Sequence, residues 1–182
     1  MPSESARMNS AAEARFRIQT ASSYSRTVKV IALDTPSESV VRRLASGSWE
    51  HTTFLTAASL SATPPVNSES SLMGCAKRKR DSAQPQELSD LAGRPRNLTE
   101  EVDAADLVVM VATPGGRAHA ASIIGEACSL RRVMTTGLVV GGTSAPEAAL
   151  SKTLLQLRPW SLMVVIADPD DYIDNMLAAL RA

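Results

Sequence analysis

A short loop of threonine, proline and glycine at residues 113–116 is the part of this sequence best suited to hold a ligand. It follows the apolar run 107–111 and precedes a segment with helical periodicity from Ala118 onward. A glycine loop between a strand and a helix directs backbone N–H groups and the positive end of the helix dipole at one point, which suits an anion. Arg117 and His119 could pair with the same anion, the alternative being that both are exposed loop residues.

The sequence contains no pattern typical of catalysis or of metal binding. We find no nucleophile–base pair, no cluster of His, Cys and carboxylate residues at ligand spacing, and no P-loop lysine motif. We therefore predict no catalytic residue and no metal ligand. The sequence leaves an enzymatic activity uncertain and leans against one.

Composition limits the kinds of partner that we expect. The 182 residues favour one domain, and the 19 basic residues equal the 19 acidic ones. This balance gives no overall field for nucleic acid or a membrane surface. Aromatic residues make up 3% and apolar residues 44%, so the core is built mainly from aliphatic side chains. Such a core favours layers of helices and sheet.

Cellular location is read from cysteine use and from the absence of targeting signals. Cys75 and Cys128 lack paired spacing and are interpreted as free thiols in a reducing compartment. No apolar run approaches the roughly 18 residues of a membrane span, and no secretory signal is present. We expect a cytoplasmic protein with no membrane contact. Residues 1–26 are interpreted as a flexible tail, the alternative being a transit peptide.

The order of apolar runs predicts the fold. Unbroken aliphatic runs are typical of strands that are covered on both faces of a parallel sheet. Helical patterns lie between them, so we predict an α/β fold, a Rossmann-like three-layer sandwich with a mostly parallel, doubly wound sheet of about five strands. Residues 27–182 would form this single domain. The predicted strands are 27–33, 51–57, 107–111, 133–140 and 161–167.

Capping patterns predict where the helices begin. Thr35 is predicted as an N-cap, with proline following it and Glu38 completing a capping box. Ser144 and Glu147 give a second box, and Asn97 opens a short acidic helix. A terminal helix is predicted to follow Asp168, with residues 169–171 in its first turn.

Residues 58–96 interrupt this regular pattern as a long polar insertion. Lys77 to Arg80 form a basic run that could contact phosphate or an acidic partner. Without interleaved aromatic residues we interpret it as a solvated loop, and nucleic-acid binding is disfavoured. A short helix is predicted at 85–91.

Ligands of doubly wound sheets bind beyond the carboxyl ends of the strands, where the strand order reverses. If the first and third predicted strands are neighbours, the turn at 34–37 and the loop at 113–117 form the two walls of that crevice. Asp168, after the last strand, would lie at the same edge. The candidate ligand-binding residues are therefore Asp34, Thr113, Gly115, Gly116, Arg117, His119 and Asp168.

The order of these segments resembles the nucleotide-binding half of the tubulin/FtsZ family. The resemblance spans roughly residues 27–175 and implies a fold in which the glycine loop meets the phosphates of GTP or GDP. It is carried by TVKVI at 27–31, FLTA at 54–57, ADLV at 105–108 running into the glycines at 115–116, IGEA at 124–127 and LMVVIAD at 162–168.

The sequence departs from the family pattern at the nucleotide itself. The family has glycines after the first strand, whereas Asp34 and Pro36 supply a repelling carboxylate and remove an N–H donor. The phosphate loop is shortened, and we find no counterpart of the central helix, the catalytic loop or the second domain. We expect a non-catalytic domain that acts as an interaction or regulatory module through a protein partner or a homodimer. The alternative is a small Rossmann-type protein that binds a nucleotide or an anionic metabolite at Gly115 and Gly116.

Overall fold

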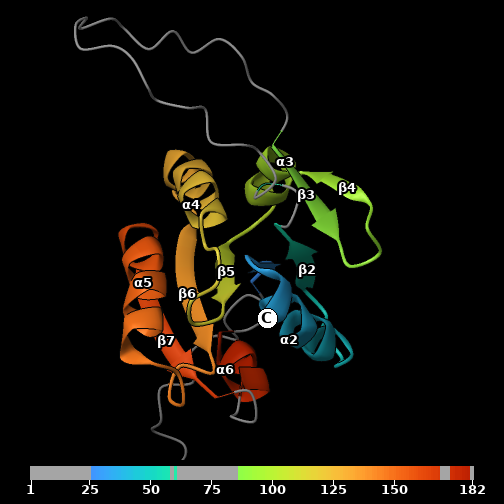
Figure 1. The fold of residues 1–182 in the computed structure, drawn as a ribbon. Helices are drawn as coiled ribbons and strands as arrows, with labels where there is room; N and C mark the ends of the chain where they lie inside the picture. The colour runs from blue at the N-terminus through green and yellow to red at the C-terminus, as the bar shows by residue number, and fades with distance from the viewer. Residues whose placement is uncertain (1–25, 58–59, 61–85, 169–172, 181–182) are drawn as a thin grey trace, which may run out of the picture.

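The computed structural model describes residues 26–57, 60, 86–168 and 173–180. The predictions for the N-terminal tail, Cys75, the basic run and residues 169–171 lie outside these ranges. Within them the chain forms an α/β fold around one mixed, mostly parallel sheet of seven strands (Figure 1).

Five neighbouring strands of the sheet are those that the aliphatic runs predict. These are β1 (Val28–Ala32), β2 (Thr52–Thr56), β5 (Leu107–Ala112), β6 (Met134–Val140) and β7 (Met163–Ala167). All neighbouring pairs among them are parallel. β1 and β5 are buried along their whole length, which explains why their sequences lack polar alternation.

Two short strands that the sequence did not predict extend the sheet beyond β2. β3 (Glu87–Asp90) runs antiparallel to β2, and β4 (Pro95–Asn97) runs antiparallel to β3. The predicted helix at 85–91 is therefore wrong where the structure describes it. The free edge of β2 supplies hydrogen-bond partners for this segment, and Leu88 is fully buried in the core. The turn between the strands contains Gly93 at φ +77°, a conformation that favours glycine.

Helices cover both faces of the sheet. α3 (Leu98–Asp103), α4 (Ala120–Arg131) and α5 (Glu147–Leu157) contribute to the apolar cluster on one face. α2 (Thr35–Ala45) and α6 (Ile173–Ala179) contribute to the cluster on the other face. Successive residues of a strand point to opposite faces and so belong to different clusters; in β1, Ile31 lies in the first cluster and Val30 in the second.

Two predicted helix starts are shifted. Asp34, and not Thr35, is the N-cap of α2, because its carboxylate accepts the backbone N–H of Ser37 at 2.7 Å and Ser37 completes the capping box. α5 begins at Glu147 after Pro146, whose extended backbone precludes an earlier start, so Ser144 is not its cap. Asn97 caps α3 as predicted. No helix in the described ranges has the length and apolar character that a bilayer crossing requires.

Candidate functional site

The strand order places the candidate site between β1 and β5. The order is β4-β3-β2-β1-β5-β6-β7. The next strands after β1 in the chain, β2 to β4, lie on one side of it, and those that follow β5 lie on the other side, so the strand order reverses between β1 and β5. We call this position the switch point. The prediction that the first and third predicted strands are neighbours is confirmed. Pairing continues past the strand ends, where the N–H of Leu33 donates to the carbonyl of Val111 at 2.9 Å. Asp34 and Thr113 consequently lie side by side at this switch point.

The carboxylate of Asp34 connects the two walls of the crevice. Its Oδ1 accepts the N–H of Ser37 in the first turn of α2. Its Oδ2 accepts both the backbone N–H of Thr113 at 2.9 Å and the Thr113 hydroxyl at 3.1 Å. Asp34 is buried, with 9% of its surface exposed. One acidic side chain therefore caps a helix and holds the start of the glycine loop.

Gly116 packs directly against this carboxylate. A Cβ atom at position 116 would lie 2.1 Å from Oδ2 of Asp34 and 3.0 Å from the carbonyl oxygen of Thr113. Only a residue without a side chain fits here without displacing Asp34. The glycine is thus required by close approach to the protein's own acidic group.

The backbone N–H groups of the loop donate to acceptors within the protein. The N–H of Gly115 donates to the hydroxyl of Thr153 at 2.9 Å and to the carbonyl of Ala149 at 3.1 Å, both on α5. The N–H of Ala118 donates to Oε1 of Gln156 at 2.9 Å, one turn further along the same helix. The N–H of Gly116 donates to the Thr113 carbonyl. Two of these three donors therefore fasten the loop to α5, and the third closes a turn within the loop.

The other predicted site residues are less closely grouped. Arg117 and His119 are exposed, and neither side chain has a hydrogen-bond or ionic partner within the described ranges. His119 occupies the N-cap position of α4 without a side-chain cap bond. Asp168 lies at the same edge of the sheet and accepts the hydroxyl of Thr143, but its strand is separated from β5 by β6.

The arrangement offers little for acid–base, nucleophilic or metal chemistry. Among the described residues no group of three or more His, Cys, Asp and Glu side chains could hold a metal ion. Cys128 is buried on the inner side of α4, and this burial raises the pKa of its thiol to about 11, with Arg131 lowering it partly. A thiol in that state is a poor nucleophile at neutral pH.

A buried ion pair is a feature that our sequence interpretation missed. Lys29, in the middle of β1, has only 9% of its side chain exposed and lies 2.7 Å from Oε2 of Glu101 on α3. Its ammonium also donates to the Thr53 hydroxyl at 3.0 Å, and Arg96 lies 3.7 Å from the other oxygen of Glu101. The signal was a lysine within an aliphatic strand. Because a buried charge needs a partner, that lysine predicts an acidic residue on the covering helix.

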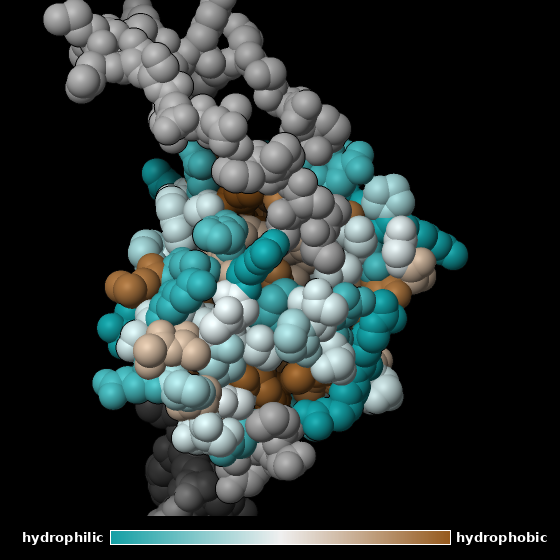
Figure 2. Space-filling view, in the orientation of Figure 1, coloured by the Kyte–Doolittle hydropathy of each residue, from teal (hydrophilic) through white to brown (hydrophobic). Residues whose placement is uncertain are grey.

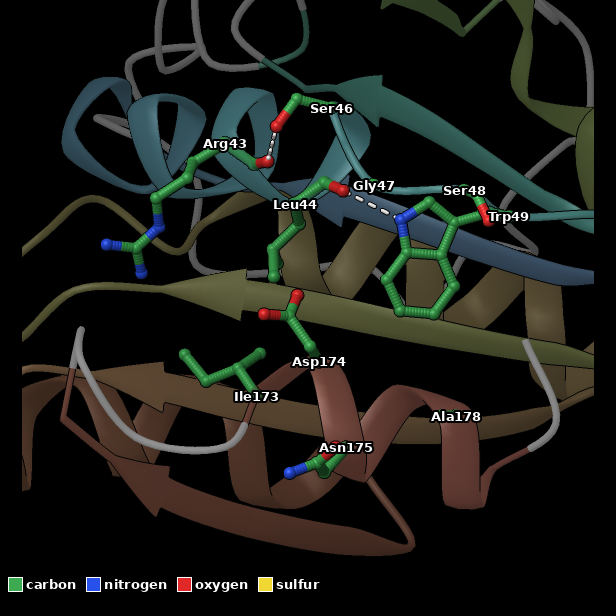
Figure 3. A pocket seen from close by; sticks show the side chains of 10 residues that line it. All are labelled: Arg43, Leu44, Ser46, Gly47, Ser48, Trp49, Ile173, Asp174, Asn175 and Ala178. Atoms are coloured by element: carbon green, nitrogen blue, oxygen red, sulfur yellow. Dashed lines mark hydrogen bonds between the residues drawn. The ribbon is translucent and has the colours of Figure 1, made fainter.

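A groove of about 640 Å³ lies away from the switch point, between the C-terminal part of α2 and α6 (Figure 3). Trp49 forms one wall, where its indole N–H donates to the Leu44 carbonyl at 2.7 Å. Asp174 and Ile173 approach from α6 on the opposite side. None of the predicted site residues lines this groove.

Compared with models of known protein families and with curated proteins, the sequence gives no match.

Proposed function

We propose that this chain is a non-catalytic, Rossmann-like domain that serves as a protein-interaction or regulatory module. The observation that carries the proposal is the occupation of the switch point by the Asp34 carboxylate, against which Gly116 packs. A phosphate at this position would meet a negative charge at short range. Two like charges at about 4 Å repel by roughly 4 kcal/mol at an effective dielectric constant of 20.

The use of the loop's donors supports the same proposal. A phosphate-binding loop leaves successive N–H groups free to face the anion. Here Gly115, Gly116 and Ala118 donate to protein acceptors, and two of these donors hold α5. Ligand binding at this loop would require these bonds to be replaced, and the compensating contacts would have to come from Arg117 or His119.

The resemblance to the tubulin/FtsZ family belongs to this proposal. In that interpretation the chain keeps the strand, glycine loop and helix of a nucleotide-binding domain, while Asp34 has replaced the glycines that would face a nucleotide. We also propose a cytoplasmic location, because Cys128 is a free thiol in the described structure.

Thermal unfolding of the full chain with GTP, GDP, ATP, NAD, phosphate and sulfate tests the proposal. A ligand at about 100 times its dissociation constant stabilises a fold by about 2.7 kcal/mol, or roughly 5–10 °C for a chain of this size. We expect no shift of that size with any member of the panel. A clear shift with one nucleotide would refute a module whose switch point is closed to ligands and would favour the ligand-binding alternative.

A second candidate function is binding of a nucleotide or an anionic metabolite at Gly115 and Gly116. It is favoured by the exposed side chains of Arg117 and His119 beside the N-terminus of α4, which have no partner among the residues that the structure describes. In this case Arg117→Ala should lower the affinity for that ligand by more than about tenfold. The ligand is the one that shifts the melting temperature of the wild-type protein. Arg94→Ala, which removes an exposed arginine from the β3–β4 turn, is the matched control and should leave binding unchanged.

A further inference from the structure

The two edges of the sheet differ in how they are protected. β4, at one edge, has three residues and includes a proline and an arginine. Short length, charge and proline are devices that prevent an edge strand from pairing with another chain. β7, at the opposite edge, has five residues, all of them uncharged and none of them proline. The β7 edge therefore lacks the features that protect β4.

The surface around β7 is apolar. Leu162 is 82% exposed, Met163 46% and Ile166 42%. Leu155, on the helix that covers this end of the sheet, is 75% exposed. Figure 2 shows apolar atoms at the left margin of the view, over α5, between hydrophilic neighbours. Ile166 and Leu150 both border Gly142, which places α5 over the edge strand.

The outer side of β7 has backbone groups available for pairing. The carbonyl of Ala167, the last residue of β7, accepts the N–H of Gly141 and therefore points towards β6. Because backbone groups of a strand alternate in direction, those of Val164 and Ile166 point outward. No strand pairs with this side within the described residues.

The exposed side of α5 carries charges that complement a second copy of themselves. Glu147, Ser151 and Leu155 of α5 recur at spacings of four residues, and Arg158, the C-cap residue with helical backbone, follows three residues later on the same face. Thr153 and Leu157 are buried on a different face, and the hydroxyl of Thr153 bonds to the loop after β5. The acidic residue lies at the start of this stripe and the basic residue at its end.

We propose that β7 and α5 form a two-fold symmetric interface with a second copy of this chain, in which the two β7 strands pair antiparallel. β7 and α5 are each about 16 Å long, so one two-fold axis can pass beside the middle of both elements. That axis places the two α5 helices antiparallel, with Glu147 of each copy opposite Arg158 of the other. Leu155 of each copy then lies opposite the N-terminal half of α5 in the other copy.

The proposed dimer rests on the proposed function, because it names the partner of a domain that would act through protein contacts. Sedimentation velocity of the full chain over a range of concentrations tests it. We expect the mass of the wild-type particle to rise from one chain to two. A monomer at high micromolar concentration, or an assembly larger than a dimer, would overturn the proposal.

Substitutions locate the interface. Leu155→Lys and Met163→Lys replace exposed residues, so folding should be retained, and each should raise the dimer dissociation constant by about tenfold or more. Leu130→Lys is the matched control, since Leu130 is 76% exposed on α4, away from the α4 face that meets Trp160. A dimer that survives both edge substitutions, or that is lost equally in the control, would refute the assigned surface.

Charge exchange tests the two-fold arrangement itself. Glu147→Arg and Arg158→Glu each place like charges opposite one another and should weaken the dimer about fivefold. The double variant restores opposite charges and should return the dissociation constant to within about threefold of wild type. Failure of the double variant to recover would overturn the antiparallel register.

The ligand panel separates this inference from the proposed function. A monomer without a ligand shift would refute the dimer and leave the interaction module with a different partner. A dimer together with a nucleotide shift would support the interface and refute a switch point that is closed to ligands.

Discussion

Replacing Gly116 with alanine should destabilise the protein, although the usual effect of such a change has the opposite sign. Position 116 has no positive φ in the structure, so alanine fits its backbone conformation. At such positions Gly→Ala typically stabilises a protein by about 0.4–1 kcal/mol, because it reduces the freedom of the unfolded chain. Here the close contact with Asp34 outweighs that stabilisation, so alanine at position 116 should lower the free energy of unfolding.

The magnitude follows from the contacts of the new methyl group. Its carbon would lie 2.1 Å from Oδ2 of Asp34, more than about 1 Å closer than the usual 3.3 Å or more for such an approach. Moving the carboxylate breaks the two hydrogen bonds from Thr113, each worth about 1.5–3 kcal/mol as bonds to a charged group. After the entropic gain is subtracted, we expect a loss of about 3 kcal/mol in the free energy of unfolding.

Urea denaturation of four proteins forms the assay: wild type, Gly116→Ala, Asp34→Ser and the double variant. Serine at position 34 can still cap α2 but has no atom at the place of Oδ2. In that background alanine at 116 should cost only about 1 kcal/mol, since the tight contact with the Thr113 carbonyl remains. Gly116→Ala with wild-type or greater stability would refute the packing of the loop against Asp34.

The buried ion pair and the buried thiol give two further predictions. Lys29→Met leaves Glu101, whose side chain is 13% exposed, with Arg96 as its remaining ionic partner among the described residues, and it should cost about 3–5 kcal/mol in urea denaturation. Lys29→Met combined with Glu101→Leu should recover most of this loss, and equal losses would contradict the pairing. Burial raises the pKa of Cys128 from its ordinary 9.0 to about 11, which favours the protonated thiol in the folded state. Its contribution to the free energy of unfolding is therefore present below pH 9.0 and is lost as pH rises towards about 11. Cys128→Ala should remove this decline when the free energy of unfolding is measured against pH. An unchanged pH dependence would contradict the raised pKa of the Cys128 thiol.

The central strands could be predicted from the sequence because their burial leaves a local signal. The run that forms β5 is apolar at every position since both faces of the sheet are covered by helices. From the sequence, the pairing of β1 with β5 was only a condition, and the structure meets that condition, which places Asp34 beside Thr113.

The parts that could not be predicted depend on contacts between distant residues. β3 and β4 are short and mostly polar, and they form strands because β2 offers them a free edge. The hydroxyl of Thr153 accepts the N–H of Gly115 from 38 residues away, so nothing near the glycine loop indicates that its donors are used. The ligand-binding roles of all seven candidate residues remain predictions: Asp34, Thr113, Gly115, Gly116, Arg117, His119 and Asp168.

Isothermal titration of GTP and of inorganic phosphate into the full chain tests the central claim most directly. With Asp34 at the switch point and the loop donors engaged by α5, we predict no saturable heat of binding for either titrant. A saturable one-site isotherm that Arg117→Ala abolishes and Arg94→Ala preserves would contradict the claim.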